Sequence, residues 1–286
     1  MARVKGKIKT IKNSFAITSW GYDLRSKKIL FLISLLNHFG HQRKGLRNSI
    51  AGSLERLSKN GEVLLRIRTK GRKPAQIKFR LNDYSDYQGL GECLGGMYEI
   101  TYLTIDYFID GGANIGFFTI LIHRKSIYKE AILVEPNPGN LKLLEHNIVS
   151  FPNIHVVPAA LTNTEGNVVF ELANSNTGHI KGAIGHPGTE ANVLVKAKVL
   201  SKIIPRNWDM QRTLLKLDIE GAEYDVIGDI VSNKIFPKII VAEIHDYLRC
   251  NGIGLVHTLE SEGYQVKVTG FRTVGNVCRQ IVAVHV

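Results

Sequence analysis

The chain has 286 residues, 44% of them hydrophobic, and three cysteines without a Cys-x-x-Cys pair. This composition excludes an intrinsically disordered chain and argues against a disulfide framework or a structural zinc site. It fits one large α/β domain plus an extension, in a reducing compartment such as the cytoplasm.

The net charge of +12 is concentrated at the N-terminus. Residues 1–80 contain 20 lysines and arginines but only three acidic residues, so this segment carries +17 and the remainder −5. Such a segment can contact an anionic membrane surface, RNA or another polyanion, or a phosphorylated substrate. A basic surface without a specific partner is the alternative.

Residues 1–60 are predicted to form a basic, partly helical extension. The apolar run at 29–36 is much shorter than the ~20 residues of a membrane-spanning helix, so we expect a helix docked on the main domain, with peripheral membrane contact as the alternative. Residues 61–103 are predicted to be a small hairpin and a lead-in segment, because two alternating stretches within 61–81 flank a Gly71–Pro74 turn.

Residues 104–286 alternate apolar runs with helical patterns, which predicts a mostly parallel sheet with ligands at the carboxyl ends of its strands. The predicted strands are 107–110, 131–135, 154–157, 213–218, 238–244, 264–269 and 278–285, and the predicted helices are 116–125, 138–149, 222–233 and 253–262. Within the long stretch 158–212, residues 168–172 and 193–199 are predicted strands that flank a polar loop, Asn174–His179. We expect 172–192 to cover the substrate, and a plain antiparallel extension is the alternative.

The first strand leads into a glycine-rich turn, Asp110-Gly-Gly-Ala-Asn-Ile-Gly116, before a helix. Glycine accepts positive φ and lets a ligand approach the backbone, while the N–H groups at the start of the following helix form a partly positive binding site. Glu135 ends the second strand 19 residues after Gly116, the spacing at which a carboxylate binds a ribose diol. A dinucleotide and S-adenosylmethionine both fit this pairing. Asp110 favours the latter, because an acid would repel pyrophosphate but can help hold the cationic methionine end.

The chain resembles the FkbM family of S-adenosylmethionine-dependent methyltransferases in five motifs. These are Phe108–Thr119, Val134–Pro138, Ala159–Gly166, Leu214–Glu223 and Glu243–His245. The resemblance implies a class I methyltransferase (Rossmann-like) fold, an α/β architecture whose seven-stranded, mostly parallel sheet has an antiparallel last strand. It also implies O-methylation, since family members of known activity methylate hydroxyl groups on sugars and polyketide-type metabolites.

The resemblance further implies a set of cofactor-binding residues. They are Asp110, Gly112, Asn114, Gly116, Glu135, Asn137, Ala160, Thr162 and Asp218. The first four would line the methionine end and Glu135 the ribose. Thr162 would lie near the adenine, where this chain has no acid.

Charged residues end the fourth and fifth strands. Lys216, Asp218 and Glu220 share a face if the strand stays extended, and a Lys–Asp pair that only holds the strand end is the alternative. Glu243 and His245 share a face of the fifth strand. We predict His245 and Asp218 as catalytic residues that accept the proton of the acceptor hydroxyl, and Glu220 and Glu243 as substrate-binding residues. A divalent metal ion held by Asp218, Glu243 and His245 is a less favoured alternative.

The sequence therefore predicts an S-adenosylmethionine-dependent O-methyltransferase that acts on a sugar-like small molecule, a glycan or a secondary metabolite. One alternative is an RNA methyltransferase that uses the basic segment, although no nucleic-acid-binding motif supports it. A second is a non-catalytic binding protein with the same fold, and a nicotinamide-dependent oxidoreductase is the least favoured.

Overall fold

The computed structural model describes residues 17–39, 44–69, 73–81, 86, 89–91, 93, 104–173, 177–181, 191–246, 252–273 and 276–286. The chain divides into two compact units. The first unit contains Met1–Thr101, Ile115–Lys125 and Leu143–Ser150, and the second contains the remaining residues. The predicted division at residues 60 and 103 stays a prediction.

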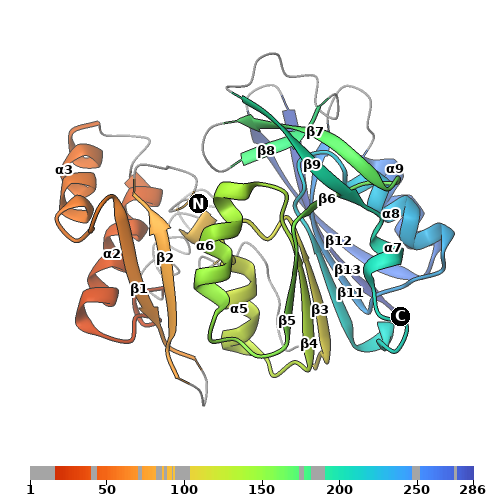
Figure 1. The fold of residues 1–286 in the computed structure, drawn as a ribbon, viewed down its shortest axis with the longest axis horizontal. Helices are drawn as coiled ribbons and strands as arrows, with labels where there is room; N and C mark the ends of the chain where they lie inside the picture. Colours follow the sequence, from red (N-terminus) through yellow and green to blue (C-terminus); the bar gives the residue numbers. More distant parts are fainter. Residues whose placement is uncertain are drawn as a thin grey trace, which may run out of the picture. The chain divides into compact units, whose positions relative to one another are not determined.

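A seven-stranded sheet forms the centre of the second unit, with the strand order β12-β13-β11-β10-β3-β4-β5 (Figure 1). The strands are β3 (Tyr107–Gly111), β4 (Glu130–Val134), β5 (Ile154–Val157), β10 (Thr213–Leu217), β11 (Ile239–Asp246), β12 (Tyr264–Thr273) and β13 (Asn276–His285). The five strands from β5 to β11 are parallel, whereas β13 runs antiparallel to β11 and to β12. Each of the seven predicted strands is present. Chain order reverses at β3, so the carboxyl ends of β4, β3 and β10 lie side by side at a topological switch point.

Two helices of the second unit pack on this sheet, α8 (Glu223–Ser232) and α9 (Gly252–Ser261). Aliphatic side chains from both join those of the central strands in one buried core, which includes Val226, Ile230, Leu259, Ile109, Leu215 and Ile240. The strands are apolar because side chains on both of their faces are buried, as in β10, where all five residues are buried. This core makes the strand ends rigid supports for polar side chains.

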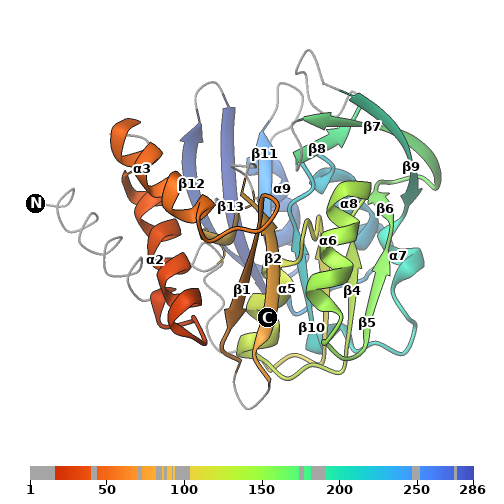
Figure 2. The same cartoon turned by 60° about the vertical axis from the view of Figure 1, so that its left-hand side comes forward.

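A second, four-stranded sheet has the order β6-β9-β7-β8 (Figure 2). It is formed by β6 (Ala159–Leu161), β7 (Gly166–Ala173), β8 (Thr177–Ile180) and β9 (Ala191–Lys198). The strands predicted at 168–172 and 193–199 are confirmed. The loop predicted at Asn174–His179 is wrong at its end, because Thr177–Ile180 pairs with β7 and buries His179 beside Glu171. Residues 174–176 and 182–190 lie outside the described part of the chain, so the substrate cover stays a prediction.

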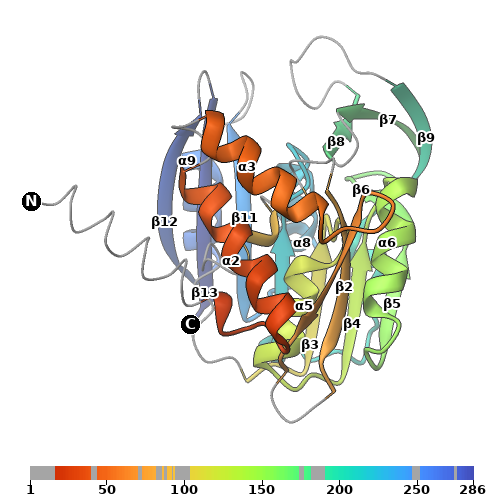
Figure 3. The ribbon, with the colours of Figure 1, turned by 90° about the vertical axis from the view of Figure 1, so that its left-hand side faces the viewer.

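The first unit contains α2 (Leu24–Phe39), α3 (Lys44–Glu55) and a hairpin of β1 (Glu62–Ile67) and β2 (Ala75–Arg80). Figure 3 shows α2 and α3 side by side. The antiparallel hairpin confirms the prediction, and the apolar run in α2 buries Ile29, Leu30 and Ile33.

The first unit also includes α5 (Phe117–Lys125) and the last residues of α6 (Pro138–Ile148). Asn147 of α6 accepts a hydrogen bond from the backbone N–H of Lys78 and donates to the carbonyl oxygen of Ile115. This asparagine links the hairpin to the residue before Gly116. All four predicted helices, at α5, α6, α8 and α9, are present.

No helix in the described ranges combines the length and the apolar content that crossing a bilayer requires.

Candidate active site

The turn after β3 is held in conformations that favour glycine. Gly112, Asn114 and Gly116 have φ values of 72°, 51° and 94°. A Cβ atom on Gly112 would lie 1.9 Å from the carbonyl oxygen of Asp218, so the loop after β10 packs directly on the turn. The backbone N–H of Asp218 also donates to the carbonyl of Gly111, at 3.2 Å. The two loops therefore form one fixed edge.

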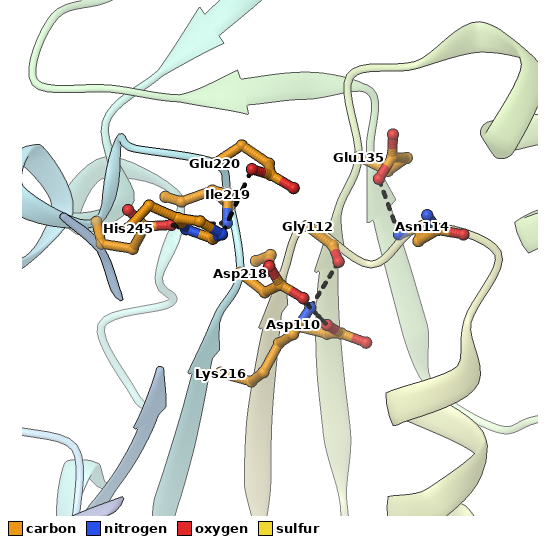
Figure 4. Close-up of polar contacts among 11 residues, drawn as sticks. Asp110, Gly112, Asn114, Glu135, Lys216, Asp218, Ile219, Glu220 and His245 are labelled. Atoms are coloured by element: carbon orange, nitrogen blue, oxygen red, sulfur yellow. Dashed lines mark hydrogen bonds and ion pairs between the residues drawn. The ribbon is translucent and has the colours of Figure 1, made fainter. Parts of the chain in front are cut away.

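A buried lysine holds this edge together (Figure 4). The Nζ atom of Lys216 donates to the carbonyl oxygens of Gly112 and Gly111 at 2.6 and 3.2 Å, and lies 3.2 Å from Oδ1 of Asp110. Both charged side chains are buried. This contact of Lys216 with the turn was not predicted from the sequence. The available signal was position, because Lys216 and Asp110 are both the fourth residue of neighbouring parallel strands and pair in register.

Asp110 therefore has its carboxylate paired inside the protein. The structure shows this carboxylate in an ion pair with Lys216. Its role at the methionine end of the cofactor stays a prediction.

Glu135 lies at the end of β4, and its carboxylate is buried. It accepts hydrogen bonds from the backbone N–H groups of Asn114 and Asn137, at 2.8 and 2.9 Å, and from the side chain of Asn140, at 3.3 Å. Burial raises the pKa of Glu135, and these hydrogen bonds oppose the rise. A carboxylate has about four lone-pair positions, so the three accepted hydrogen bonds leave Glu135 about one position for a ribose hydroxyl group.

The remaining predicted cofactor residues are less closely linked to this edge. The side chain of Asn137 accepts from the N–H of Gly139 at the start of α6, and Ala160 is buried in β6. The hydroxyl of Thr162 donates to the carbonyl of Thr164 at 2.7 Å. Their contacts with the cofactor stay predictions.

The strand predicted at 213–218 is present, but it does not stay extended to Glu220, so Glu220 does not continue the face of Lys216 and Asp218. β10 ends at Leu217, and Glu220 and Gly221 have φ values of 53° and 103°. This left-handed turn brings a carboxylate oxygen of Glu220 to 3.4 Å from Nε2 of His245 on β11. Lys216 and Asp218 do stay on one side, with Nζ and Oδ2 3.9 Å apart.

A fully buried acid, Glu223 in the first turn of α8, orients His245. Its carboxylate accepts from Nδ1 of His245 at 3.1 Å and from the backbone N–H groups of Ile219 and Gly221, at 3.1 and 2.9 Å. The same side chain thus fixes the imidazole and the loop that carries Glu220. The sequence gives no direct signal for this contact, because 22 residues separate the two partners.

Asp218, Glu220 and His245 form what we name the acid–histidine cluster. One potential ligand atom from each lies within 4.8 Å of the others. In the described part of the chain this is the group that could hold a metal ion, and Glu243 does not belong to it. The alternative metal set that included Glu243 is therefore wrong, because the turn at Glu220 brings a different carboxylate to the histidine. The substrate contacts expected of Glu220 and Glu243 stay predictions.

Comparison with known proteins gives a family. The Methyltransferase FkbM domain matches residues 110–266, which is more than half of the chain. "Methyltransferase 1" of Beauveria bassiana is 29% identical over 205 residues, which cover 60% of this chain and 77% of that protein.

Solved structures of methyltransferases are also similar. The FkbM methyltransferase of Methylobacillus flagellatus has 13% sequence identity and a TM-score of 0.45, and the match covers 98% of this chain but only 60% of that one. TYW2 of M. jannaschii, solved with AdoMet, has 13% identity and a TM-score of 0.40, with 80% and 89% of the two chains covered. The domain match, on a chain with the sheet and the glycine turn described above, shows that this protein belongs to the FkbM family of S-adenosylmethionine-dependent methyltransferases.

Proposed function

We propose that the protein transfers a methyl group from S-adenosylmethionine to a hydroxyl group of a sugar-like small molecule, a glycan or a secondary metabolite. The observation that carries this proposal is the acid–histidine cluster, which lies beside the glycine turn at the carboxyl edge of the sheet. The donor has two matching features in the structure. These are a turn that leaves no room for a Cβ at Gly112 and a carboxylate, Glu135, with capacity for about one further hydrogen bond from a ribose hydroxyl group.

When bound, S-adenosylmethionine supplies an electrophilic methyl group. The protein must hold the acceptor oxygen in line with that group and accept one proton. Because Nδ1 of His245 faces the carboxylate of Glu223, we assign the proton to Nδ1 and the lone pair to Nε2. His245 or Asp218 then takes the proton, and Glu220 and Glu243 accept hydrogen bonds from other hydroxyl groups of the substrate.

The charge of the cluster supports a hydroxylated substrate over RNA. Two carboxylates beside the proposed acceptor position can accept hydrogen bonds from a polyol but would repel phosphate groups. RNA methylation would require the basic segment to overcome that repulsion.

A transfer assay with radiolabelled S-adenosylmethionine tests the proposal against separate fractions of glycans, lipids, RNA, protein and small metabolites. We expect label in a hydroxylated glycan or small-molecule fraction, with a rate about 10²–10⁴-fold lower for His245→Gln or Asp218→Asn. The control Glu171→Gln, on β7 outside the cluster, should retain the wild-type rate. Label confined to RNA would contradict the proposal.

We also infer that residues 1–80 contact an anionic membrane surface, with the protein working in the cytoplasm and at the membrane periphery. Their net charge of +17 supports this contact. Sedimentation with vesicles should show binding that requires anionic lipid and decreases with salt, and binding to neutral vesicles alone would count against it.

A further inference from the structure

The acid–histidine cluster has a second chemical capacity besides proton transfer. We propose that Asp218, Glu220 and His245 bind a divalent cation. Their three ligand atoms lie within 4.8 Å of one another and come from two elements of the rigid sheet edge, the loop after β10 and the end of β11.

The distance between two of these ligands suits a shared ion. Nε2 of His245 and Oε2 of Glu220 are 3.4 Å apart, which is longer than a good N–H···O hydrogen bond of about 2.7–3.2 Å. Two ligands that each lie about 2.1 Å from one ion are about 3.4 Å apart in tetrahedral geometry and about 3.0 Å apart in octahedral geometry. The separation is therefore within about 0.4 Å of an edge of either coordination sphere.

The orientation of the imidazole supports the same conclusion. A histidine that binds a metal usually donates its other ring N–H to a carboxylate, which directs the free lone pair toward the ion. Glu223 is fully buried and lies 3.1 Å from Nδ1 of His245, so it supplies this support. With Nδ1 protonated, a neutral imidazole presents only a lone pair at Nε2, and Glu220 opposite also offers only lone pairs. A cation between them would be coordinated by both groups.

The negative charge of the site also suits a divalent cation. Five carboxylates lie along this edge, those of Asp110, Glu135, Asp218, Glu220 and Glu223. Lys216 lies near two of these carboxylates, those of Asp110 and Asp218. The cationic end of the methyl donor offsets one negative charge, and a divalent ion would offset two more, because close like charges in a partly buried site are unfavourable.

The donor atoms indicate the class of ion. Carboxylate oxygens suit Mg²⁺, Ca²⁺ and Mn²⁺, whereas imidazole suits first-row transition metals, so a mixed set favours an ion such as Mn²⁺. Three protein ligands leave open coordination positions, as in catalytic metal sites. In a role that rests on the proposed function, an open position holds the acceptor oxygen. The one lone pair of His245, at Nε2, is then used by the ion, whereas Asp218 binds the ion through one carboxylate oxygen and can accept the proton on the other.

A titration of the full chain with Mn²⁺ tests the site without any substrate. The chelator-treated protein is titrated in the absence of S-adenosylmethionine, and free Mn²⁺ is followed by electron paramagnetic resonance. We expect saturable binding of one ion, weakened at least tenfold in Glu220→Gln and in Asp218→Asn. Glu223→Gln should also weaken binding, but less than either ligand change, because Glu223 positions His245 and the loop that carries Glu220 without binding the ion itself.

A matched control is available in the second sheet. Glu171 also lies 3.1 Å from a buried histidine, His179, but the pair is outside the acid–histidine cluster. Glu171→Gln should therefore bind Mn²⁺ like the wild type, which shows that loss of a carboxylate next to a histidine is not enough. Glu220 is partly exposed, so its variant should fold, and thermal melting checks this.

Two outcomes would overturn the site. One is the absence of saturable Mn²⁺ binding, and the other is equal binding by the wild type and a folded Glu220→Gln variant. The result also separates this inference from the proposed function. Mn²⁺ binding at the cluster without methyl transfer to any hydroxyl would support the site and reject the function. Methyl transfer to a hydroxyl by a protein that does not bind Mn²⁺ would support the function and reject the site.

Discussion

The neighbouring central strands β3 and β10 are joined by an ion pair at each end. The pair at the amino ends is exposed, and the pair near the carboxyl ends is buried. At the amino ends, Arg212 donates two hydrogen bonds to Asp106, at 2.6 and 2.9 Å, and both arginine and the added partner Lys129 are exposed. Four residues further along each strand, Lys216 pairs with Asp110, and both are buried.

Stability alone can explain the exposed pair but not the buried one. An exposed pair requires little desolvation and holds the strand ends in register at a small gain. A buried pair loses several kcal/mol of hydration per ion, and apolar residues of similar volume are often as stable. Lys216 and Asp110 therefore indicate a requirement other than stability, and the hydrogen bonds of Lys216 to Gly111 and Gly112 identify it as the shape of the turn.

The largest difference between the two pairs is expected when the cation of each pair, Lys216 or Arg212, is removed. Lys216→Met should lower the free energy of unfolding by about 3–5 kcal/mol, because it leaves the carboxylate of Asp110 buried without its cation. Arg212→Met should cost much less, because solvent can reach Asp106. Urea unfolding of both variants measures the difference, and equal losses would show that burial does not distinguish the two pairs.

A smaller effect is expected from adding one carbon atom to the turn. In Gly112→Ala the Cβ would meet the carbonyl of Asp218 at 1.9 Å, and the φ of 72° is strained for alanine, so we expect a loss of about 1–3 kcal/mol from strain alone. The donor should also no longer raise the melting temperature. Gly166→Ala is the control, because its φ is 144° but no atom lies within 4 Å of the added carbon. If both variants bind the donor normally, the close packing of the turn is not needed for binding.

The sequence predicted the parts of this architecture that depend on local pattern. Apolar runs and their spacing located the seven strands, and glycines followed by an acid at a fixed interval located the turn and Glu135. Contacts that depend on an unusual backbone could not be predicted. Glu220 reaches His245 only because a non-glycine residue adopts a φ of 53°, and no local pattern encodes that choice.

The burial of two acidic side chains also could not be predicted from the sequence. Asp110 and Glu223 follow the same sequence rules as exposed acids, yet both are fully buried. Their partners, Lys216 and His245, are 106 and 22 residues away, so the pairs exist only once the parallel sheet brings the strand ends together.

Two carboxyl groups, Glu135 after β4 and Asp106 before β3, should give stability changes with pH of opposite sign. Burial raises the pKa of Glu135 above its ordinary value of 4.5. Its contribution to stability is therefore fully present below the pKa of the unfolded chain and is lost as the pH rises through the folded pKa. In Glu135→Gln this loss cannot occur, so the stability of the variant relative to wild type should improve as the pH increases above about 4.5. Urea midpoints between pH 4 and pH 8 measure the trend, and a relative decline would mean that hydrogen bonding outweighs burial.

The smallest effect is expected at Asp106, with the opposite sign. Hydrogen bonds from Arg212 and Lys129 lower the pKa of Asp106 from 3.8 to about 2. Its contribution is therefore present above the unfolded pKa and is lost as the pH decreases through the folded pKa. Asp106→Asn should be slightly less stable than wild type near pH 6, because the backbone hydrogen bonds of residue 106 remain, and the difference should disappear between about pH 4 and pH 2. High salt should reduce the difference at pH 6, since both cations are exposed. If the variant remains equally less stable than wild type at low pH, Asp106 acts through packing and not through its charge. The exposed and buried pairs would then differ in their geometry and not in the electrostatic contribution of Asp106.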